Sequence, residues 1–109
     1  PPGPEAVAHA REDAFNRHDL SALAALYAPD ARIFEPPDRL RETGSPSIRE
    51  AYARSFSMAP DARVRVTETM TEGNLTVVRE TSTRAGTTRS SIRVLEVRDG
   101  RIAVEWILR

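Results

Sequence analysis

The sequence predicts an α+β domain in which helices pack on one face of a curved antiparallel sheet. In the first half of the chain, apolar residues recur at helical spacing. After Pro60 the period changes to two, and turn residues separate several strand-like runs. Helices followed by strands are typical of α+β architecture. We expect the 109 residues to form a single domain over 1–109, with no internal linker.

Two helices are predicted before residue 30. Pro4 and Glu5 begin the first, because proline fits the first helical turn and a carboxylate stabilises the positive end of the helix dipole. Asp19 is a suitable N-cap for a second, shorter helix over about residues 20–27. Pro29 is expected to end that helix.

A short strand and a third helix are expected next. Residues 31–35 read as a strand that ends at Pro36, because proline cannot continue a hydrogen-bonded ladder. Residues 38–46 are polar and are expected to form a loop. Ser47 and Glu50 then have the spacing of a capping box at the start of the third helix.

Four strands of an antiparallel meander complete the chain. Asp99-Gly100 is the strongest hairpin signal, because both residues accept the backbone angles of a tight turn. The first of the four predicted strands begins near Val64, and the other three cover residues 75–84, 87–98 and 102–108.

The balance of charge excludes several classes of function. Sixteen arginines face 16 Asp and Glu residues, and there is no lysine. A net charge of zero offers no field for nucleic acid or an anionic membrane. No run approaches the roughly 20 apolar residues that span a bilayer, and none resembles a signal peptide, so we expect a cytoplasmic location. Arginine in place of lysine, beside 15 alanines, indicates a GC-rich and therefore bacterial source.

No metal or cofactor is expected. The chain has no cysteine, and its two histidines, His9 and His18, are nine residues apart, which does not place them on one helix face. The serines and threonines of 81–91 have no histidine near them in sequence, so a nucleophilic triad is not supported.

Four strings together resemble the nuclear-transport-factor-2-like superfamily, in particular its SnoaL-like and ketosteroid-isomerase-like members. The strings are Asn16–Leu20, Leu26–Ala31, Ile48–Tyr52 and Val97–Ile102, in this order along the chain. The resemblance implies a cone, in which a curved sheet wraps around three helices and leaves an apolar pocket at the open end. Its members isomerise, cyclise or dehydrate hydrophobic compounds, or bind without chemistry, so the fold alone does not name a reaction.

The isomerase branch implies specific roles. Its catalytic carboxylate falls on Glu35, just before Pro36, and its supporting helical tyrosine falls on Tyr52. The two oxyanion donors of that branch do not match, because Arg11 and Arg93 stand in their places. The resemblance therefore makes Glu35 the expected general base, Arg93 or Arg11 the anion stabiliser, and Tyr52 a supporting donor. An arginine within reach of Glu35 would oppose a role as base.

The cyclase branch is also incomplete. Its catalytic aspartate falls on Ile107, beside Trp106, while Glu105 lies two residues earlier and shares the same face. Arg93 and Glu105 could contribute to a site, or could form an internal ion pair between neighbouring strands. Both interpretations are open at the level of sequence.

We therefore expect a pocket protein for a small hydrophobic or carbonyl-bearing molecule. One hypothesis is a cofactor-independent enzyme that transfers protons as an isomerase or cyclase does. The alternative is a non-catalytic ligand-binding or accessory module of the same fold. The residues expected to contact the ligand are Arg11, Phe15, Ile33, Phe56, Glu105 and Ile107.

The last strand predicts a partner. Its residues at even positions form one apolar face, Ile102, Val104, Trp106 and Leu108. If Glu105 and Ile107 face the cone, this apolar face lies outside and favours a homodimer packed sheet to sheet. The reverse arrangement would instead place Trp106 in the core of a monomer.

Overall fold

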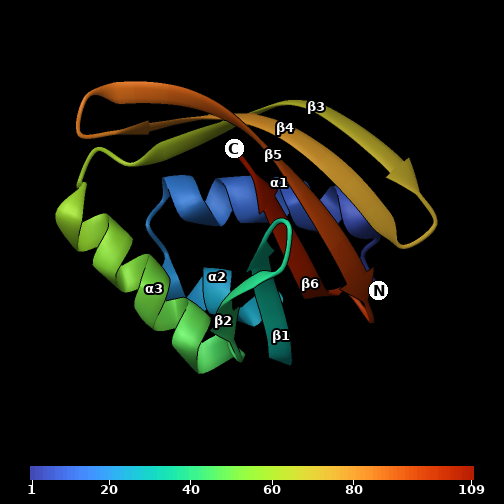
Figure 1. Ribbon diagram of the computed structural model, residues 1–109. Helices are drawn as coiled ribbons and strands as arrows, with labels where there is room; N and C mark the ends of the chain where they lie inside the picture. The colour runs from blue at the N-terminus through green and yellow to red at the C-terminus, as the bar shows by residue number, and fades with distance from the viewer.

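The computed structural model describes residues 1–109 and shows three helices inside the curve of a six-stranded, unclosed sheet (Figure 1). This arrangement confirms the predicted α+β class. The helices are α1 (Pro4–Asn16), α2 (Leu20–Ala25) and α3 (Ser45–Met58). The strands are β1 (Tyr27–Glu35), β2 (Arg39–Thr43), β3 (Arg63–Glu72), β4 (Leu75–Arg84), β5 (Thr87–Arg98) and β6 (Arg101–Leu108). None of the helices is long and apolar enough to cross a membrane.

The strand order explains how the ends of the chain meet. Strands β3 to β6 form the predicted antiparallel meander, and the full order is β2-β1-β6-β5-β4-β3. The last strand, β6, pairs in parallel with β1. The sheet is therefore mixed, and the expectation of a wholly antiparallel sheet is wrong for this one pair. The pairing brings residues of the first third of the chain beside the C-terminal strand.

The second helix is shorter than predicted. Asp19 is its N-cap, and the Asp19 carboxylate accepts a hydrogen bond from the backbone N–H of Ala22. The helix ends at Ala25, and Tyr27 already belongs to β1. Pro29 thus lies inside a strand, which is tolerated because the pairing of β1 with β6 is irregular between Tyr27 and Arg32.

The segment expected to be a loop contains a strand. Residues 39–43 form β2 and pair antiparallel with β1. The predicted capping box is also wrong, because α3 begins at Ser45 after an N-cap at Gly44, whose φ of 88° favours glycine. The Ser47 hydroxyl instead donates to the Glu42 carboxylate of β2, at 2.6 Å.

A bulge in β6 decides which side chains face inward. Glu96 is opposite Val104 but Val97 is opposite Ile102, so Ala103 is an extra residue that reverses the alternation. Ile102 therefore lies in the core, and the expectation that it shares the outer face with Trp106 is wrong. Beyond the bulge Glu105 and Ile107 point inward as expected.

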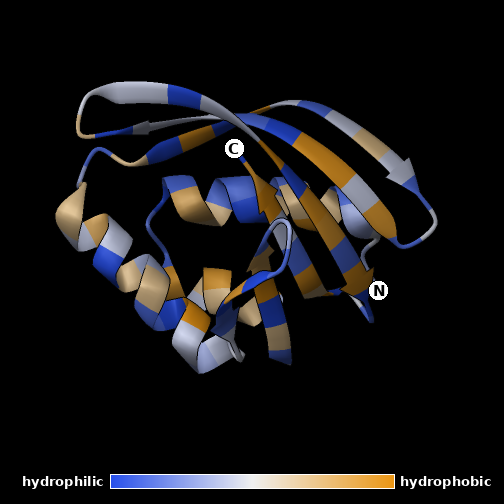
Figure 2. Ribbon diagram, in the orientation of Figure 1, coloured by the Kyte–Doolittle hydropathy of each residue, from blue (hydrophilic) through white to orange (hydrophobic).

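The core fills the space between the helices and the concave face of the sheet, where apolar residues alternate with polar ones along the strands (Figure 2). Helix α1 also contributes polar side chains to the edge strand β3. The Asn16 amide donates to the Val64 carbonyl and accepts from the Val64 N–H, both at 2.8 Å. Glu12 accepts from the N–H of Val66. These bonds satisfy backbone groups that an edge strand would otherwise leave unpaired.

Candidate ligand-binding site

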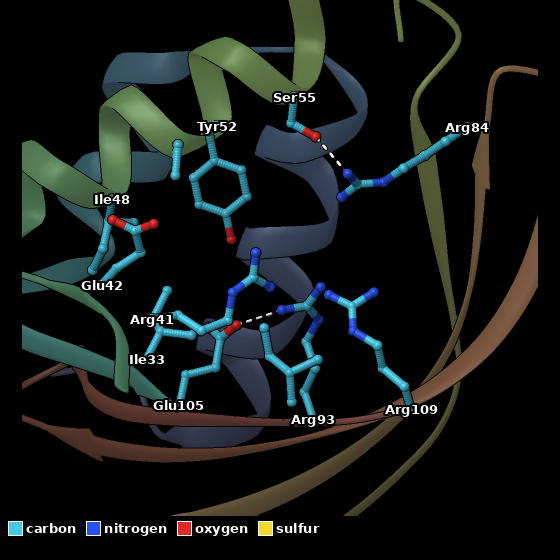
Figure 3. A pocket seen from close by; sticks show the side chains of 12 residues that line it. Ile33, Arg41, Glu42, Ile48, Tyr52, Ser55, Arg84, Arg93, Glu105 and Arg109 are labelled. Carbon is cyan, nitrogen blue, oxygen red and sulfur yellow. Dashed lines mark hydrogen bonds and ion pairs between the residues drawn. The ribbon is translucent and has the colours of Figure 1, made fainter. Parts of the chain in front are cut away.

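A cavity of about 130 Å³ lies between α3 and the concave face of the sheet (Figure 3). Strand β6 and the β1–β2 hairpin close its remaining sides. The lining residues are Ile33, Arg41, Glu42, Ile48, Ala51, Tyr52, Ser55, Arg84, Arg93, Glu105, Ile107 and Arg109. Four of these twelve are arginines and two are glutamates, so the cavity carries positive charge in a chain whose net charge is zero.

Five of the residues predicted for the site line this cavity. They come from four elements and are Ile33, Tyr52, Arg93, Glu105 and Ile107. Glu105 and Ile107 share one face of β6 by the period of two, and this face is the one that points inward.

Three other predicted contact residues lie away from the cavity lining. Phe15 is fully buried, and its ring meets that of Phe56 edge to face, with centroids 5.0 Å apart. Phe56 also stacks on His18 at 4.0 Å. Both phenylalanines therefore act in the aromatic core beneath the cavity. Arg11 lies deeper still, behind Tyr52, where its side chain is buried.

Glu35 stands outside the cavity lining, in a cluster of arginines. One carboxylate oxygen, Oε1, lies 3.4 Å from Arg39 and 3.6 Å from Arg41. The other oxygen, Oε2, lies 3.2 Å from Nε of Arg109. Both oxygens are thus in ion pairs at the wall, and this arrangement opposes the use of Glu35 as a general base.

The base of the cavity is a closed ring of six hydrogen-bonded side chains. Its members come from six different elements and are Arg11, Tyr52, Tyr27, Glu105, Arg93 and Glu80, in the order in which they are bonded. The two tyrosines are neighbours in this order, and the two arginines balance the two glutamates, so the ring is neutral overall.

The carboxylates of the ring are each held on both oxygens. Glu80 accepts from Arg93 at 3.0 Å and from Arg11 at 3.2 Å. Glu105 accepts from the Tyr27 hydroxyl at 2.6 Å and from Arg93. Buried charges need such complete pairing, because removal from water costs several kcal/mol per ion. Arg93 and Glu105 therefore form an internal ion pair between neighbouring strands, one of the two interpretations that the sequence left open.

The ionisation of the ring follows from its contacts. Burial raises the pKa of Tyr27 well above its usual value, and neighbouring Glu105 raises it further, so the phenol stays protonated. For Glu80, burial raises the pKa, but Arg11 and Arg93 together lower it more, so the net shift is downward. For Arg11, burial lowers the pKa, while Tyr52, Tyr27 and the glutamates raise it well above the usual value.

The direction of the hydrogen bonds fixes what Tyr52 can donate. Tyr27 has one hydroxyl proton and donates it to Glu105, so in its 2.7 Å contact with Tyr52 it accepts. The Tyr52 proton is therefore directed toward Tyr27. The Tyr52 oxygen in turn accepts from Nε of Arg11 at 3.1 Å.

Several residues of the site were not predicted from the sequence. Arg84 and Glu80 share a face of β4 by the period of two, and Arg109 continues the face of Glu105 and Ile107. That periodicity is the signal that could have found these three. Glu42 and Arg41 had no such signal, because their segment was expected to be a loop. No group of three or more His, Cys, Asp or Glu side chains gathers at the cavity or elsewhere.

The curved sheet around three helices, with a cavity over a buried polar ring, can now be compared with known folds. The chain belongs to the SnoaL-like domain family, whose model matches residues 7–105. No curated protein matches it in sequence.

Solved structures support the same fold. An uncharacterised cystatin-fold protein from Novosphingobium aromaticivorans matches over 100% of both chains, with a TM-score of 0.93 and 16% identity. A candidate polyketide cyclase from Sinorhizobium meliloti has a TM-score of 0.82 and 23% identity, over 94% of this chain and 93% of that one. A candidate ketosteroid isomerase from Kribbella flavida has a TM-score of 0.84 and 24% identity, over 94% of this chain and 73% of that one.

Replacing Glu80 with glutamine should destabilise the fold strongly. Glu80→Gln leaves two buried guanidinium groups without their shared carboxylate, which should cost about 3–5 kcal/mol of unfolding free energy. Because the pKa of Glu80 is lowered in the folded state, its stabilisation is present above the ordinary glutamate value and is lost as the pH falls through the folded pKa. The acid-side loss of stability should therefore be shallower in E80Q than in the wild type.

Urea unfolding between pH 3 and 7, followed by circular dichroism, would measure both effects. The exposed Glu68, which pairs with Arg79 at the surface, supplies the control variant Glu68→Gln. It should change stability by less than about 1 kcal/mol. A loss in E80Q as small as that in E68Q would show that the ring does not support the fold.

Proposed function

We propose that this chain binds a small organic molecule in the cavity between α3 and the sheet, as a ligand-binding module. The observation that carries the proposal is the composition of the cavity. Apolar side chains of Ile33, Ile48 and Ile107 lie on its walls beside charged ones, while Tyr52 and Arg93 present polar atoms at its base. Apolar walls with a few fixed polar groups are typical of small-molecule sites.

The ring beneath the cavity favours binding over chemistry at the predicted carboxylates. Glu105 is the buried acid at the base of the cavity, and both of its oxygens already accept hydrogen bonds. Glu35 lies outside the lining, and its carboxylate is held in ion pairs with Arg39 and Arg109. Rigid, fully paired groups lower the entropic cost of binding, because little is left to order when a ligand enters.

Filling the cavity should abolish binding. Ala51→Phe, on the wall formed by α3, places a ring in the space that a ligand would occupy. We expect at least about tenfold weaker binding of ring-bearing fragments such as benzamide, indole and 2-tetralone. Ala53→Phe, on the other side of the same helix, is the matched control. Titrations followed by protein NMR would give the affinities, and equal affinity in the wild type and A51F would contradict the proposed site.

A second candidate function is proton transfer by Glu42. This carboxylate lies on the cavity wall and has no arginine partner; one oxygen accepts from Ser47 and the other makes no bond within the chain. It could take a proton from the carbon beside a ketone, with the electron pair moving to the carbonyl oxygen as an enolate. Arg93 would stabilise that oxyanion. The names of the cyclase and isomerase relatives support this candidate at the level of fold.

Deuterium exchange would test the candidate reaction. In D₂O the wild type should accelerate exchange at the carbons beside the carbonyl of 2-tetralone by about 10²–10⁴-fold, the usual contribution of a general base. Glu42→Gln should lose this acceleration while still binding the ketone, and Glu35→Gln should keep it. If the wild type binds 2-tetralone without accelerating exchange, the chain is a binding module only.

We also propose a homodimer through the outer face of the sheet. Trp106 stacks on Phe34 there, with ring centroids 6.4 Å apart, and Val94 lies directly across from Trp106 in the sheet. Leu108 is 39% exposed on the same face. A second copy would cover this apolar surface by twofold symmetry, so that each patch meets its equivalent.

Charge at the centre of this face should separate the two copies. Trp106→Arg should weaken dimerisation by at least about thirtyfold, the effect expected when a central aromatic contact is lost. Met58→Arg, at the exposed end of α3, should leave the dimer unchanged. Light scattering at micromolar concentrations gives the mass directly. A wild-type monomer would overturn the proposed interface.

A further inference from the structure

A second recess, of about 500 Å³, opens beside the ligand cavity. It lies under the far end of the β4–β5 hairpin, and we refer to it as the mouth recess. Arg84, Arg89, Arg93 and Arg109 line it, together with four serine and threonine residues, and no acidic residue does. Arg84, Arg93, Ile107 and Arg109 line both spaces, so the recess adjoins the cavity.

Two of the four arginines of the mouth recess, Arg84 and Arg89, have no carboxylate partner within the chain. Arg93 is paired with the glutamates of the buried ring, and exposed Arg109 reaches Glu35 through Nε alone. Arg84 has no carboxylate within ion-pair distance, and its one side-chain bond is from Nη1 to the Ser55 hydroxyl, at 2.6 Å. Arg89 has no ion pair either. Figure 3 shows Arg84, Arg93 and Arg109 directed toward the same opening.

The neighbouring arginines determine the electrostatic environment of Arg84. Burial lowers the pKa of Arg84, and the nearby positive charges of Arg93 and Arg109 lower it further. A cation held among cations is stabilised when an anion enters between them. Guanidinium groups bind carboxylates through paired N–H donors, and they give up hydration water more readily than ammonium groups do. The hydroxyl groups of the recess add further donors.

The inner cavity limits the size of the rest of the ligand. Its volume of about 130 Å³ is close to that of an apolar protein cavity of about 150 Å³ that takes up benzene. Ile33, Ile48 and Ile107 supply apolar walls. The inner cavity therefore fits one ring or a short apolar chain, while anything polar that extends from it reaches the arginines of the mouth recess.

We propose that the ligand is a small organic acid, with its ring or apolar body in the inner cavity and its carboxylate between Arg84 and Arg109. The inference rests on the proposed ligand-binding function and adds the chemical class of the ligand. Because the net charge of the whole chain is zero, anions are attracted only at the mouth recess. This favours a small molecule over a polyanion.

The test compares acids with amides of the same shape. Benzoate and phenylacetate, with benzamide and phenylacetamide as neutral counterparts, would be titrated into the protein by calorimetry and NMR at pH 7. Each acid should bind at least about tenfold more tightly than its amide at low salt, and this advantage should shrink as added salt screens the charges. The double variant Arg84→Gln, Arg109→Gln should remove the advantage. Arg65→Gln, an exposed arginine of β3 without an ion pair, is the control and should keep it.

The outcomes separate this inference from the proposed function. Equal binding of acid and amide, both blocked by A51F, would overturn the acidic ligand and leave the cavity as the binding site. An acid preference that survives in the double variant would overturn the assignment to Arg84 and Arg109. Failure of all four compounds to bind would overturn both proposals.

Discussion

The ring of Arg11, Tyr52, Tyr27, Glu105, Arg93 and Glu80 is the constraint on which the rest of the structure depends. It joins α1, α3 and four strands, so a shift of any of these elements breaks a hydrogen bond to a buried polar group. Such a group, left unpaired, costs about 1–3 kcal/mol or more, and a charged one costs more still. One donor, Nη2 of Arg11, has no oxygen acceptor, but its guanidinium lies within 6 Å of the rings of Phe15 and Tyr52. Those aromatic faces offset part of that cost.

The ring also determines which groups remain for a ligand. Because Glu80 and Glu105 are engaged on both oxygens, they neutralise Arg11 and Arg93 and have nothing to spare for the mouth recess. Positive charge is therefore balanced by glutamates deep in the cone, whereas Arg84 at the opening has no carboxylate partner. Sixteen arginines against 16 acids describe the whole chain, but the balance is not local. The cavity is thus polar and rigid at its base, apolar on its walls and positive at its mouth.

The sequence predicted the four strands of the C-terminal meander well because their signals are local. Alternation along β6 left open which face of that strand points inward, and the family resemblance implied that Glu105 and Ile107 do, in agreement with their burial. Turn residues located the hairpins. Contacts between distant elements could not be predicted in this way. Nothing in the spacing of Arg11 and Glu80, which are 69 residues apart, indicates that they touch. The arginines around Glu35 were equally hidden, because Arg39 and Arg41 belong to a strand expected to be a loop, and Arg109 arrives through the parallel pairing of β1 and β6. The bulge at Ala103 was also not visible in the sequence. A single extra residue moves Ile102 to the opposite face of the sheet while the hydrophobic pattern along the strand stays the same.

The use of arginine in place of lysine has a physical consequence at both the base and the mouth of the cone. A buried lysine can lose its proton when it is removed from water, whereas a guanidinium stays charged at any physiological pH. Arg11 and Arg93 therefore hold their carboxylates permanently. Arg11 donates through Nη1 to Glu80 and through Nε to the Tyr52 hydroxyl, and Arg93 donates through Nε to Glu80 and through Nη1 to Glu105. At the mouth the same property acts differently. Arg84 keeps its charge although burial and neighbouring arginines oppose it, and no carboxylate of the chain pairs with it. The same residue type thus stabilises the base of the cone when a carboxylate of the chain faces it, and prepares the opening for a carboxylate from outside when none does.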